Sequence, residues 1–417
     1  MKILFLCSGD IKEGRFYAAS WVQSILSDLS LRNDIQLFVY FPQYGGRLKK
    51  WTEERINYCQ FAHTKSIYKV DKGVEDFFGT ELSIVAPDIV HICGTEYPYT
   101  LEMVNAAKKK SLLDKVLLVV QGLCSKISEH YCDGLPLNVV YGTTIRDFLK
   151  QDNVIQQQHK MARRGKNEIA AIKKVKHISG RTEWDKACTS LVNTSARYYH
   201  CNEFLRDVFY RGKWEVTKCE RHTIFISQYY YPIKGLHILL EAVKLLKEEF
   251  PDIKIYTTGR QISFKRFNIR ESYYFKYLKK LIKKAGLQHK VTSCGYLSAD
   301  EMCAQYMKAN VFVSPSLIEN SSNSIGEAML VGCPVVSSCV GGVNNFIEHD
   351  YNGLLYQQNA SYMLAHYIRK IFLDDDYAMK LSINARKSAR QIFDKNKNIE
   401  NLIIIYTKIA ERKFLEE

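Results

Sequence analysis

Two glutamates, Glu319 and Glu327, stand eight positions apart in the second half of this 417-residue chain. The first follows the apolar run Val311–Pro315, which predicts a buried strand, and the second falls about one turn into a helix that Asn323 or Ser324 would cap. Because ligands bind beyond the carboxyl ends of parallel strands, we expect both carboxylates at one cavity. Such a pair suits polyol chemistry, since one acid can hold sugar hydroxyls and the other a ribose. Two solvated glutamates beside a helix start are the plainer alternative.

A second candidate site lies upstream, where the predicted strand Thr223–Ser227 leads to Lys234 and Gly235. An amphipathic helix follows, with a leucine-rich face. Gly235 allows close approach of the backbone, the helix start offers unpaired N–H groups, and Lys234 adds a positive charge. Together they predict a diphosphate site. The alternative is a surface lysine that merely precedes a helix.

The residues around both sites resemble a known enzyme family. Ala328–Val336 is followed by Gly341 and Gly342, and the Lys–Gly pair lies within Tyr231–Leu236. These segments resemble, in order and spacing, the motifs of retaining glycosyltransferases of the GT-B fold, family 4. The resemblance covers residues 223 to 356. It implies an α/β protein with two Rossmann-like domains, whose parallel sheets face a cleft between the domains.

The resemblance also implies roles for single residues. Lys234 and Glu319 would be catalytic, the first at the leaving diphosphate and the second at the hydroxyls of the transferred sugar. Glu327 would bind the ribose. The other donor-side residues that it implies are Asn320, Ser321, Ser322, Gly235, Gly259, Arg260, Tyr296 and Leu297. We expect no metal and no cofactor beyond a nucleotide diphosphate sugar donor, with a UDP-sugar favoured over a GDP-sugar.

The phosphate loop departs from the family at one position. An arginine is common five residues before the lysine, and this chain has Tyr229 there. Neutralisation of the diphosphate is therefore weaker or comes from another residue. Arg260, which directly follows Gly259 at the end of a predicted strand, is one candidate, and it could equally be a solvated loop residue.

The first half would bind the acceptor. Gly14 stands in the loop after the first strand, where many family members have a Gly–Gly pair. The segment 87–96 predicts a strand and a loop that place His91 inside the strand and Glu96 at its mouth. Because a histidine inside a strand is more often a core residue, Glu96 is the better candidate for substrate contact.

Two further segments of the first half carry candidate residues. Gln121, before Gly122, stands where the family commonly has histidine; it can hydrogen-bond a sugar hydroxyl but is no general base. Arg181 would lie at the rim of the cleft, and Thr182 and Asp185 predict a capping box. The sequence from Ser179 to Asp185 is similar to a family 4 subgroup of bacterial surface-polysaccharide pathways.

Apolar runs that alternate with helical patterns support two parallel sheets. We predict an N-terminal domain over 1–205, a linker over 206–222, a nucleotide-sugar domain over 223–395 and a C-terminal helix over 396–417 that packs on the first domain. The predicted strands are Lys2–Leu6, Gln36–Tyr40, Asp88–Ile92, Val116–Val120, Lys176–Ser179, Thr223–Ser227, Ile253–Thr257, Val291–Cys294, Val311–Ser314 and Pro334–Ser337.

The composition of the chain limits its possible cellular location and binding partners. With 46% hydrophobic and 25% charged residues the chain is ordinary globular material, and its 12 cysteines form no C-x-x-C pair. The first apolar run is short and predicts a strand rather than a signal peptide, so we expect a cytoplasmic protein. The net charge of +15 gathers partly in Lys160–Lys176, which predicts attraction to anionic lipid at the inner face of the membrane. A solvated helix face is the alternative; no nucleic-acid motif is present.

These observations favour a retaining glycosyltransferase that acts on a hydroxyl of a saccharide or a lipid-linked acceptor, in cell-surface polysaccharide synthesis. Two alternatives remain open at this point. One is a non-hydrolysing nucleotide-sugar epimerase of the same fold, which would need acid–base residues in the first domain. The other is a non-catalytic subunit that binds sugar nucleotides.

Overall fold

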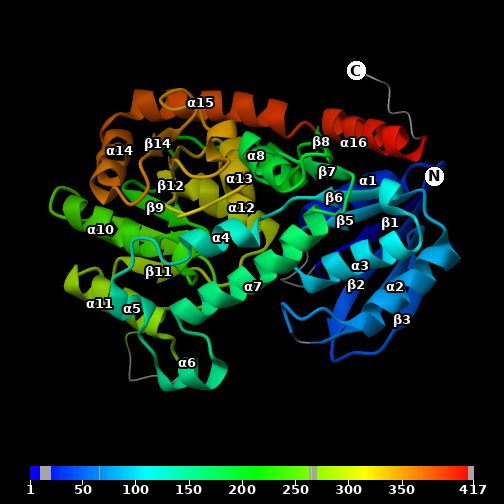
Figure 1. Cartoon of the computed structure of the whole chain (residues 1–417). Helices are drawn as coiled ribbons and strands as arrows, with labels where there is room; N and C mark the ends of the chain where they lie inside the picture. The colour runs from blue at the N-terminus through cyan, green and yellow to red at the C-terminus, as the bar shows by residue number, and fades with distance from the viewer. Residues whose placement is uncertain (10–19, 65, 263, 265–269, 412–417) are drawn as a thin grey trace. The chain divides into compact units, whose positions relative to one another are not determined.

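The structure is a computed structural model that describes residues 1–9, 20–64, 66–262, 264 and 270–411. Its internal contacts divide the chain into two compact units, and Figure 1 labels most of their helices and strands. Unit 1 comprises Met1–Ser128, Lys160–Leu205 and Phe393–Glu417. Unit 2 comprises Glu129–His159 and Arg206–Ile392. Both units are α/β, as the sequence predicted.

Unit 1 is built on a sheet with the strand order β3-β4-β2-β1-β5-β6-β7-β8. All neighbouring pairs are parallel except β3 and β4, which form an antiparallel edge. The strands are β1 (Lys2–Leu6), β2 (Gln36–Tyr44), β3 (Lys49–Glu53), β4 (Ile56–His63), β5 (Ile89–Cys93), β6 (Val116–Val119), β7 (His177–Gly180) and β8 (Arg197–His200).

Both faces of this sheet are covered, so its central strands are apolar on both sides. Ile3 and Phe5 of β1 pack into one core together with Leu402 and Tyr406, whereas Leu4 packs into the core on the opposite face. The helices that belong wholly to this unit are α1 (Ser20–Ser30), α2 (Lys72–Val85), α3 (Pro98–Lys109), η1 (Leu113–Lys115), α8 (Glu183–Val192) and α16 (Lys395–Ala410).

Unit 2 has an all-parallel sheet with the order β11-β10-β9-β12-β13-β14. Its strands are β9 (Thr223–Ile226), β10 (Lys254–Thr257), β11 (Val291–Ser293), β12 (Val311–Ser314), β13 (Val335–Ser338) and β14 (Leu354–Tyr356). The helices are α5 (Leu137–Val140), α6 (Ile145–Lys150), α9 (Asp207–Arg211), η2 (Pro232–Lys234), α10 (Leu236–Leu246), α11 (Tyr273–Lys284), α12 (Ala299–Lys308), α13 (Asn323–Val331), η3 (Val343–Asn345), α14 (Ser361–Leu373) and α15 (Asp375–Ile392).

The division of the chain differs from the predicted continuous domain over 1–205. Glu129–His159 groups with unit 2, because its backbone and side chains bond there: Thr144 Oγ1 donates to the carbonyl oxygen of Glu271 at 2.9 Å, and Asp147 accepts the amide of Tyr273 at 2.7 Å. Two helices, α4 (Cys124–His130) and α7 (Val154–Ile172), therefore contain residues of both units.

The predicted linker and the predicted C-terminal helix also have defined places. Residues 206–222 are part of unit 2, where the indole of Trp214 donates to the carbonyl oxygen of Ala309 at 2.7 Å. Helix α16 packs on the sheet of unit 1, where the hydroxyl of Tyr406 lies 2.7 Å from Nδ1 of His91. Its apolar face supplies Leu402, Ile405 and Ile409 to the core.

Each predicted strand coincides with an observed strand to within a few residues at its ends. The strands that the sequence did not predict are β3, β4, β8 and β14. Three of these lie at a sheet edge, and β4 lies next to one. Within the described part of the chain, no helix is both long and apolar enough to cross a bilayer.

Candidate active site

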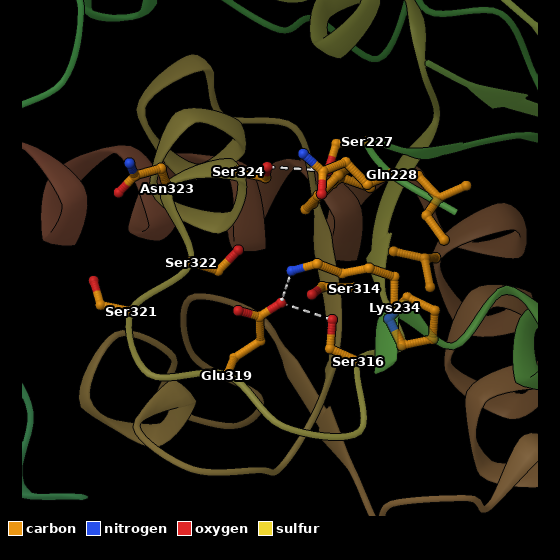
Figure 2. A pocket seen from close by; sticks show the side chains of 14 residues that line it. Ser227, Gln228, Lys234, Ser314, Ser316, Glu319, Ser321, Ser322, Asn323 and Ser324 are labelled. Atoms are coloured by element: carbon orange, nitrogen blue, oxygen red, sulfur yellow. Dashed lines mark hydrogen bonds and ion pairs between the residues drawn. The ribbon is translucent and has the colours of Figure 1, made fainter. Parts of the chain in front are cut away.

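A cavity of about 220 Å³ lies in unit 2, beyond the carboxyl ends of the neighbouring strands β9 and β12 (Figure 2). This is the edge where parallel sheets bind ligands. Its lining residues are Ile226, Ser227, Gln228, Lys234, Phe312, Val313, Ser314, Pro315, Ser316, Glu319, Ser321, Ser322, Asn323 and Ser324. Hydroxyl, amide and charged groups make up much of this lining, which suits a polar ligand.

Lys234 and Glu319 form the charged centre of the cavity. Lys234 Nζ donates to Oε1 of Glu319 at 2.5 Å, and the hydroxyl of Ser316 donates to the same oxygen at 2.8 Å (Figure 2). The two charged side chains are 26% and 13% exposed, so a ligand can still reach them. A cation and an anion therefore stand side by side where a phosphate and a sugar hydroxyl could each find a partner.

The backbone around Lys234 is held against the neighbouring loop. Gly235 has φ +69°, and a Cβ there would overlap the carbonyl oxygen of Pro315. The amide of Leu317 donates to the carbonyl oxygen of Ile233 at 2.8 Å. Because Gly235 also forms the amino end of α10, the lysine and the start of this helix lie at the same place.

The Gly341–Gly342 turn holds Glu319 from the other side. The amide of Gly342 donates to the carbonyl oxygen of Glu319 at 3.0 Å, and a Cβ at Gly341 would overlap that oxygen. Gly341 of the family-like motif therefore has a physical reason: only a residue without a side chain allows the turn to approach the backbone of Glu319 so closely.

Glu327 does not line this cavity, contrary to the expectation that both carboxylates face it. The side chain lies on α13, the residue is 6% exposed, and its two oxygens have separate partners. Arg206 donates to Oε1 at 3.0 Å, and the hydroxyl of Tyr306 donates to Oε2 at 3.2 Å. Burial raises the pKa of Glu327, and the guanidinium of Arg206 opposes this shift.

The start of α13 differs by one or two residues from the prediction. Ser322 rather than Asn323 or Ser324 is the N-cap, and its side chain makes no capping bond. Of the three donor-side residues here, Ser321 and Ser322 line the cavity, whereas Asn320 is 5% exposed and does not.

Gly259 and Arg260 follow β10. Gly259 has φ +93°, its amide donates to the carbonyl oxygen of Gly295 at 2.6 Å, and a Cβ there would overlap the ring of Tyr230. The buried hydroxyl of Tyr229 donates to the carbonyl oxygen of Arg260, while the residue Arg260 itself is exposed. The residue that replaces the family's arginine thus fixes the loop that carries another arginine.

Tyr296 and Leu297 follow Gly295, which pairs with Gly259 through an isolated bridge. Tyr296 is 58% exposed and Leu297 is partly buried. Both lie in the loop after β11, in the same unit as the cavity but outside its lining.

In unit 1 the candidate residues Glu96 and Gly122 contact each other. Oε1 of Glu96 accepts the amide of Gly122 at 2.9 Å, and Arg164 donates to the carbonyl oxygen of Glu96 at 2.7 Å. Burial raises the pKa of Glu96. Arg164 belongs to the basic segment predicted to contact lipid, but its guanidinium instead lies at Glu96, where its charge lowers the pKa of the carboxylate against the effect of burial.

Gln121 and Arg181 meet at Glu203, a residue that sequence reasoning missed. Arg181 donates to Oε2 of Glu203 at 2.6 Å and to the amide oxygen of Gln121 at 3.0 Å, and Gln121 donates to Oε1 of Glu203 at 2.6 Å. Arg181 is 3% exposed, so it lies inside the unit rather than at a rim. No local signal marks Glu203, because the three partners are far apart in sequence.

The remaining residues of unit 1 are placed as follows. His91 is 2% exposed, and burial lowers its pKa to about 3, which suits a neutral core residue. Gly14 lies outside the described residues. Thr182 caps α8 as predicted, but Asp185 does not return the bond to it: the carboxylate accepts the amide of Arg181 at 3.0 Å.

Other cavity residues were also missed by sequence reasoning. The hydroxyl of Ser227 donates to that of Ser324 at 3.0 Å, and Gln228 follows it. The signal was present, since Ser227 ends a predicted strand and Gln228 directly follows it. Across the described ranges, no group of three or more His, Cys, Asp or Glu side chains is arranged to hold a metal ion.

Comparison with known proteins agrees with this geometry. A sequence profile described as "Glycosyl transferases group 1" matches residues 210–388. An uncharacterised glycosyltransferase of Methanocaldococcus jannaschii is 28% identical over 203 residues, which cover 48% of each chain. A putative colanic acid biosynthesis glycosyltransferase of Escherichia coli, WcaL, is 27% identical over 180 residues, covering 41% of this chain and 42% of the relative. The chain thus matches less than half the length of these relatives.

A solved structure shares the fold over nearly the whole chain. HepE of Anabaena, in complex with UDP and glucose, is similar with a TM-score of 0.68 at 16% identity, covering 98% of this chain and 99% of that one. The fold is therefore that of GT-B glycosyltransferases, with two Rossmann-like sheets. Residues 210–388, which include the cavity and its Lys234–Glu319 pair, are the part of the chain that is similar to the glycosyl transferases group 1 family.

Proposed function

We propose that this protein is a retaining glycosyltransferase of family 4. It transfers a sugar from a nucleotide diphosphate sugar, a UDP-sugar in preference to a GDP-sugar, to a hydroxyl of a saccharide or lipid-linked acceptor. The observation that carries the proposal is the Lys234–Glu319 pair in the cavity at the start of α10. The resemblance to HepE, solved with UDP and glucose, supports the choice of donor.

The proposed chemistry divides between the two charged groups. As the bond from the sugar to the diphosphate breaks, negative charge grows on the leaving phosphate and positive character on the sugar carbon. Lys234 and the N–H groups of α10 stabilise the phosphate, because they are fixed where the charge develops. Glu319 holds sugar hydroxyls and orients the ring. Lys234 and the amino end of α10 supply the positive charge, so the proposed reaction needs no metal.

The proposed pathway and location follow from the wider resemblance. The similarity to WcaL supports a role in cell-surface polysaccharide synthesis. A lipid-linked acceptor would bring the enzyme to the inner face of the cell membrane as a peripheral cytoplasmic protein. The acceptor would meet residues such as Glu96 and Gly122 at the carboxyl end of the sheet of unit 1.

A donor screen tests the proposal. The purified protein is incubated with a panel of UDP- and GDP-sugars and candidate acceptors, and the released nucleotide diphosphate is measured. NMR of the product then reports whether the anomeric configuration is retained. We expect UDP release that depends on the acceptor, with retention. An epimerised nucleotide sugar, an inverted product, or nucleotide binding without turnover on any acceptor would each contradict the proposal.

A further inference from the structure

An exposed apolar surface lies on α5 and α6, in the segment that the first half of the sequence contributes to unit 2. It consists of Leu137, Tyr141, Ile145, Phe148 and Leu149, which we call the α5–α6 apolar surface. These residues fall within thirteen positions and are each between 63% and 75% exposed. Large apolar side chains exposed singly are ordinary, but a cluster of this kind marks an interaction site.

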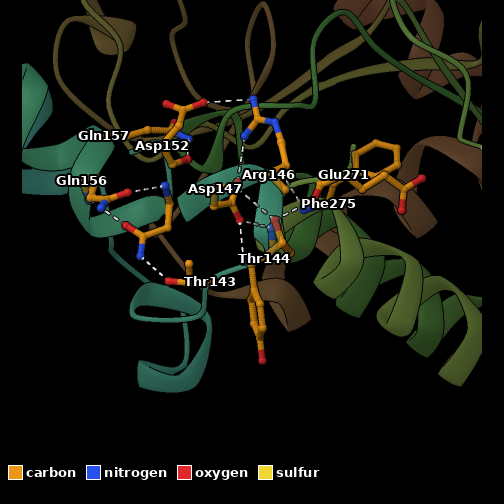
Figure 3. A network of polar contacts seen from close by, with 12 residues as sticks. Thr143, Thr144, Arg146, Asp147, Asp152, Gln156, Gln157, Glu271 and Phe275 are labelled. Atoms are coloured by element: carbon orange, nitrogen blue, oxygen red, sulfur yellow. Dashed lines mark hydrogen bonds and ion pairs between the residues drawn. The ribbon is translucent and has the colours of Figure 1, made fainter. Parts of the chain in front are cut away.

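The backbone beneath this surface is fixed. Asp147, which is fully buried, accepts the amides of Thr144 at 3.2 Å and Tyr273 at 2.7 Å and the guanidinium of Arg146 at 2.8 Å (Figure 3). Arg146 also donates to Asp152 at 3.0 Å. Because these bonds join α6 to the start of α11, the apolar side chains are presented by a rigid support.

Helix α11 adds positive charge beside the apolar surface. A Cβ at Gly142, between α5 and α6, would overlap the ring of Tyr273 at the start of α11. Lys280 and Lys284 lie seven and eleven residues further on, so they share a face of the helix with Tyr273. Both lysines are exposed, and α11 itself contains five lysines and no acidic residue.

We propose that the α5–α6 apolar surface, flanked by the lysines of α11, docks on an anionic lipid bilayer. The argument is charge complementarity: apolar side chains that enter the interface between headgroups and acyl chains, beside cations that attract anionic headgroups, are the combination that interfacial membrane proteins use. This inference rests on the proposed location at the membrane, and it identifies the surface of the protein that contacts the lipid. A second copy of this strongly basic chain is disfavoured as the occupant, since the lysines of both copies would meet.

The basic segment Lys160–Lys176, which comprises part of α7 and the residues that follow it, is a poorer surface for this purpose. Arg164 donates to a carbonyl oxygen inside unit 1, Lys174 donates to Asn105 at 2.6 Å, and Lys176 pairs with Asp114 at 2.5 Å. Much of its charge is therefore used within the protein. Lys166 and Lys173 are exposed and serve as a control for charge alone.

Sedimentation with vesicles tests the proposal on the full chain. Wild-type protein should bind vesicles rich in phosphatidylglycerol and bind phosphatidylcholine vesicles at least about tenfold more weakly. Phe148→Glu with Leu149→Glu should lower the affinity for anionic vesicles at least about tenfold, and Lys280→Glu with Lys284→Glu should do the same. Leu191→Glu, which changes a leucine of α8 that is even more exposed, and Lys166→Glu with Lys173→Glu should bind as the wild type does.

Two further measurements keep the outcomes distinct. Turnover on a soluble acceptor should be unchanged in every variant, so failed docking and failed sugar transfer are separated. Phe148→Trp should bind vesicles. On binding, its tryptophan emission should shift to shorter wavelength by more than that of the wild type. The proposal would be overturned if the wild type did not bind anionic vesicles, or if the Phe148/Leu149 variant bound them equally well. A dimer in solution that this variant dissociates would also overturn it and would identify a second copy as the occupant.

Discussion

The ammonium group of Lys234 and the carboxylate of Glu319 are in contact at 2.5 Å although 85 residues separate them in the chain. The contact exists because β9 and β12 are neighbours in the sheet, so the loops that follow them meet at one edge. Each side chain therefore fixes the position of the other, and the hydroxyl of Ser316 holds the same carboxylate oxygen at 2.8 Å.

Replacing Lys234 by alanine should affect the chemical step more than binding. In the proposed reaction, the substitution removes a fixed positive charge from the place where the leaving phosphate becomes more negative, and losses of this kind cost roughly 100- to 1,000-fold in rate. We expect turnover to fall by that factor while affinity for the donor changes much less. Steady-state kinetics and calorimetry measure both. Lys244→Ala, on the same α10 but in an exposed pair with Glu241, is the matched control, and near-normal turnover of Lys234→Ala would contradict the assignment.

Glu319→Gln should impair transfer and spare the nucleotide. The neutral amide keeps the size of the side chain but loses the charge-assisted bonds that the proposed reaction assigns to it at the sugar hydroxyls. The affinity for UDP alone should stay the same or rise, because one negative charge near the diphosphate is gone. The double variant with Lys234→Ala should cost less than the sum of both single effects, since the two groups contact each other. Strictly additive losses would show that the contact has no functional coupling.

Substitution of Glu327 distinguishes its predicted role in binding the ribose from a structural role through its bonds to Arg206 and Tyr306. Glu327→Ala should weaken nucleotide binding by roughly 1.5–3 kcal/mol if the carboxylate holds ribose hydroxyls. The same change leaves the guanidinium of Arg206 without its partner, so the melting temperature should also fall. Tyr306→Phe is the control, because it removes one hydrogen bond to Glu327 and keeps the ion pair. Lower stability with unchanged nucleotide affinity would assign Glu327 a purely structural role.

The sequence predicted the central strands because their burial on both faces requires continuous apolar runs. Val311–Ser314 is an example. The edge strands β3 and β8 have the sequences KKWTE and RYYH, whose charged and aromatic residues show no such run. Edge strands carry polar residues because one side of each faces solvent, and the same property hides them from pattern analysis.

The donor-side residues were easier to predict than their contacts. The spacing of Lys234, Gly235 and Glu319 relative to two strands indicated a common edge, and the cavity brings Lys234 and Glu319 together. The sequence could not show that Glu129–His159 belongs to unit 2, because this grouping depends on bonds such as that between Asp147 and Tyr273, which are 126 residues apart. Tertiary contacts of this kind leave no periodic signal in the sequence.

Glu168 should make the stability of the protein depend on pH. Burial raises its pKa to about 7 from an ordinary value of 4.5, although Ser125, Cys124 and Thr95 all donate to it. The folded protein therefore binds more protons than the unfolded chain between these values, so the free energy of unfolding falls as pH rises from about 4.5 to about 7, by up to about 3 kcal/mol.

Denaturant unfolding of the wild type and of Glu168→Gln across this pH range measures the effect. The amide cannot ionise, so the variant should be less stable overall but should lose the part of the slope that Glu168 contributes. The comparison is the difference between the two profiles, which removes the contribution of other titrating groups. Parallel profiles from pH 4.5 to 7 would show that Glu168 ionises in the folded protein as it does in the unfolded chain.

Arg260 is one candidate to replace the missing arginine of the phosphate loop. It is exposed, it follows the tight turn at Gly259, and the hydroxyl of Tyr229 fixes its backbone. If its guanidinium pairs with the diphosphate, Arg260→Ala should weaken UDP binding by roughly 1.5–3 kcal/mol. The loss should shrink as salt is raised, because screening weakens an exposed charge pair.

The role of Tyr229 in this arrangement gives the sharper comparison. Tyr229→Phe keeps the buried ring and removes only the bond to the carbonyl oxygen of Arg260, so the loop loses a constraint but keeps its charge. We expect a smaller loss of UDP affinity than for Arg260→Ala, with the same dependence on salt, and little further loss when both changes are combined. Lys380→Ala, which removes an exposed cation on α15, is the control for general charge effects. UDP affinity that is insensitive to Arg260→Ala would leave Lys234 and the start of α10 as the groups that carry the diphosphate.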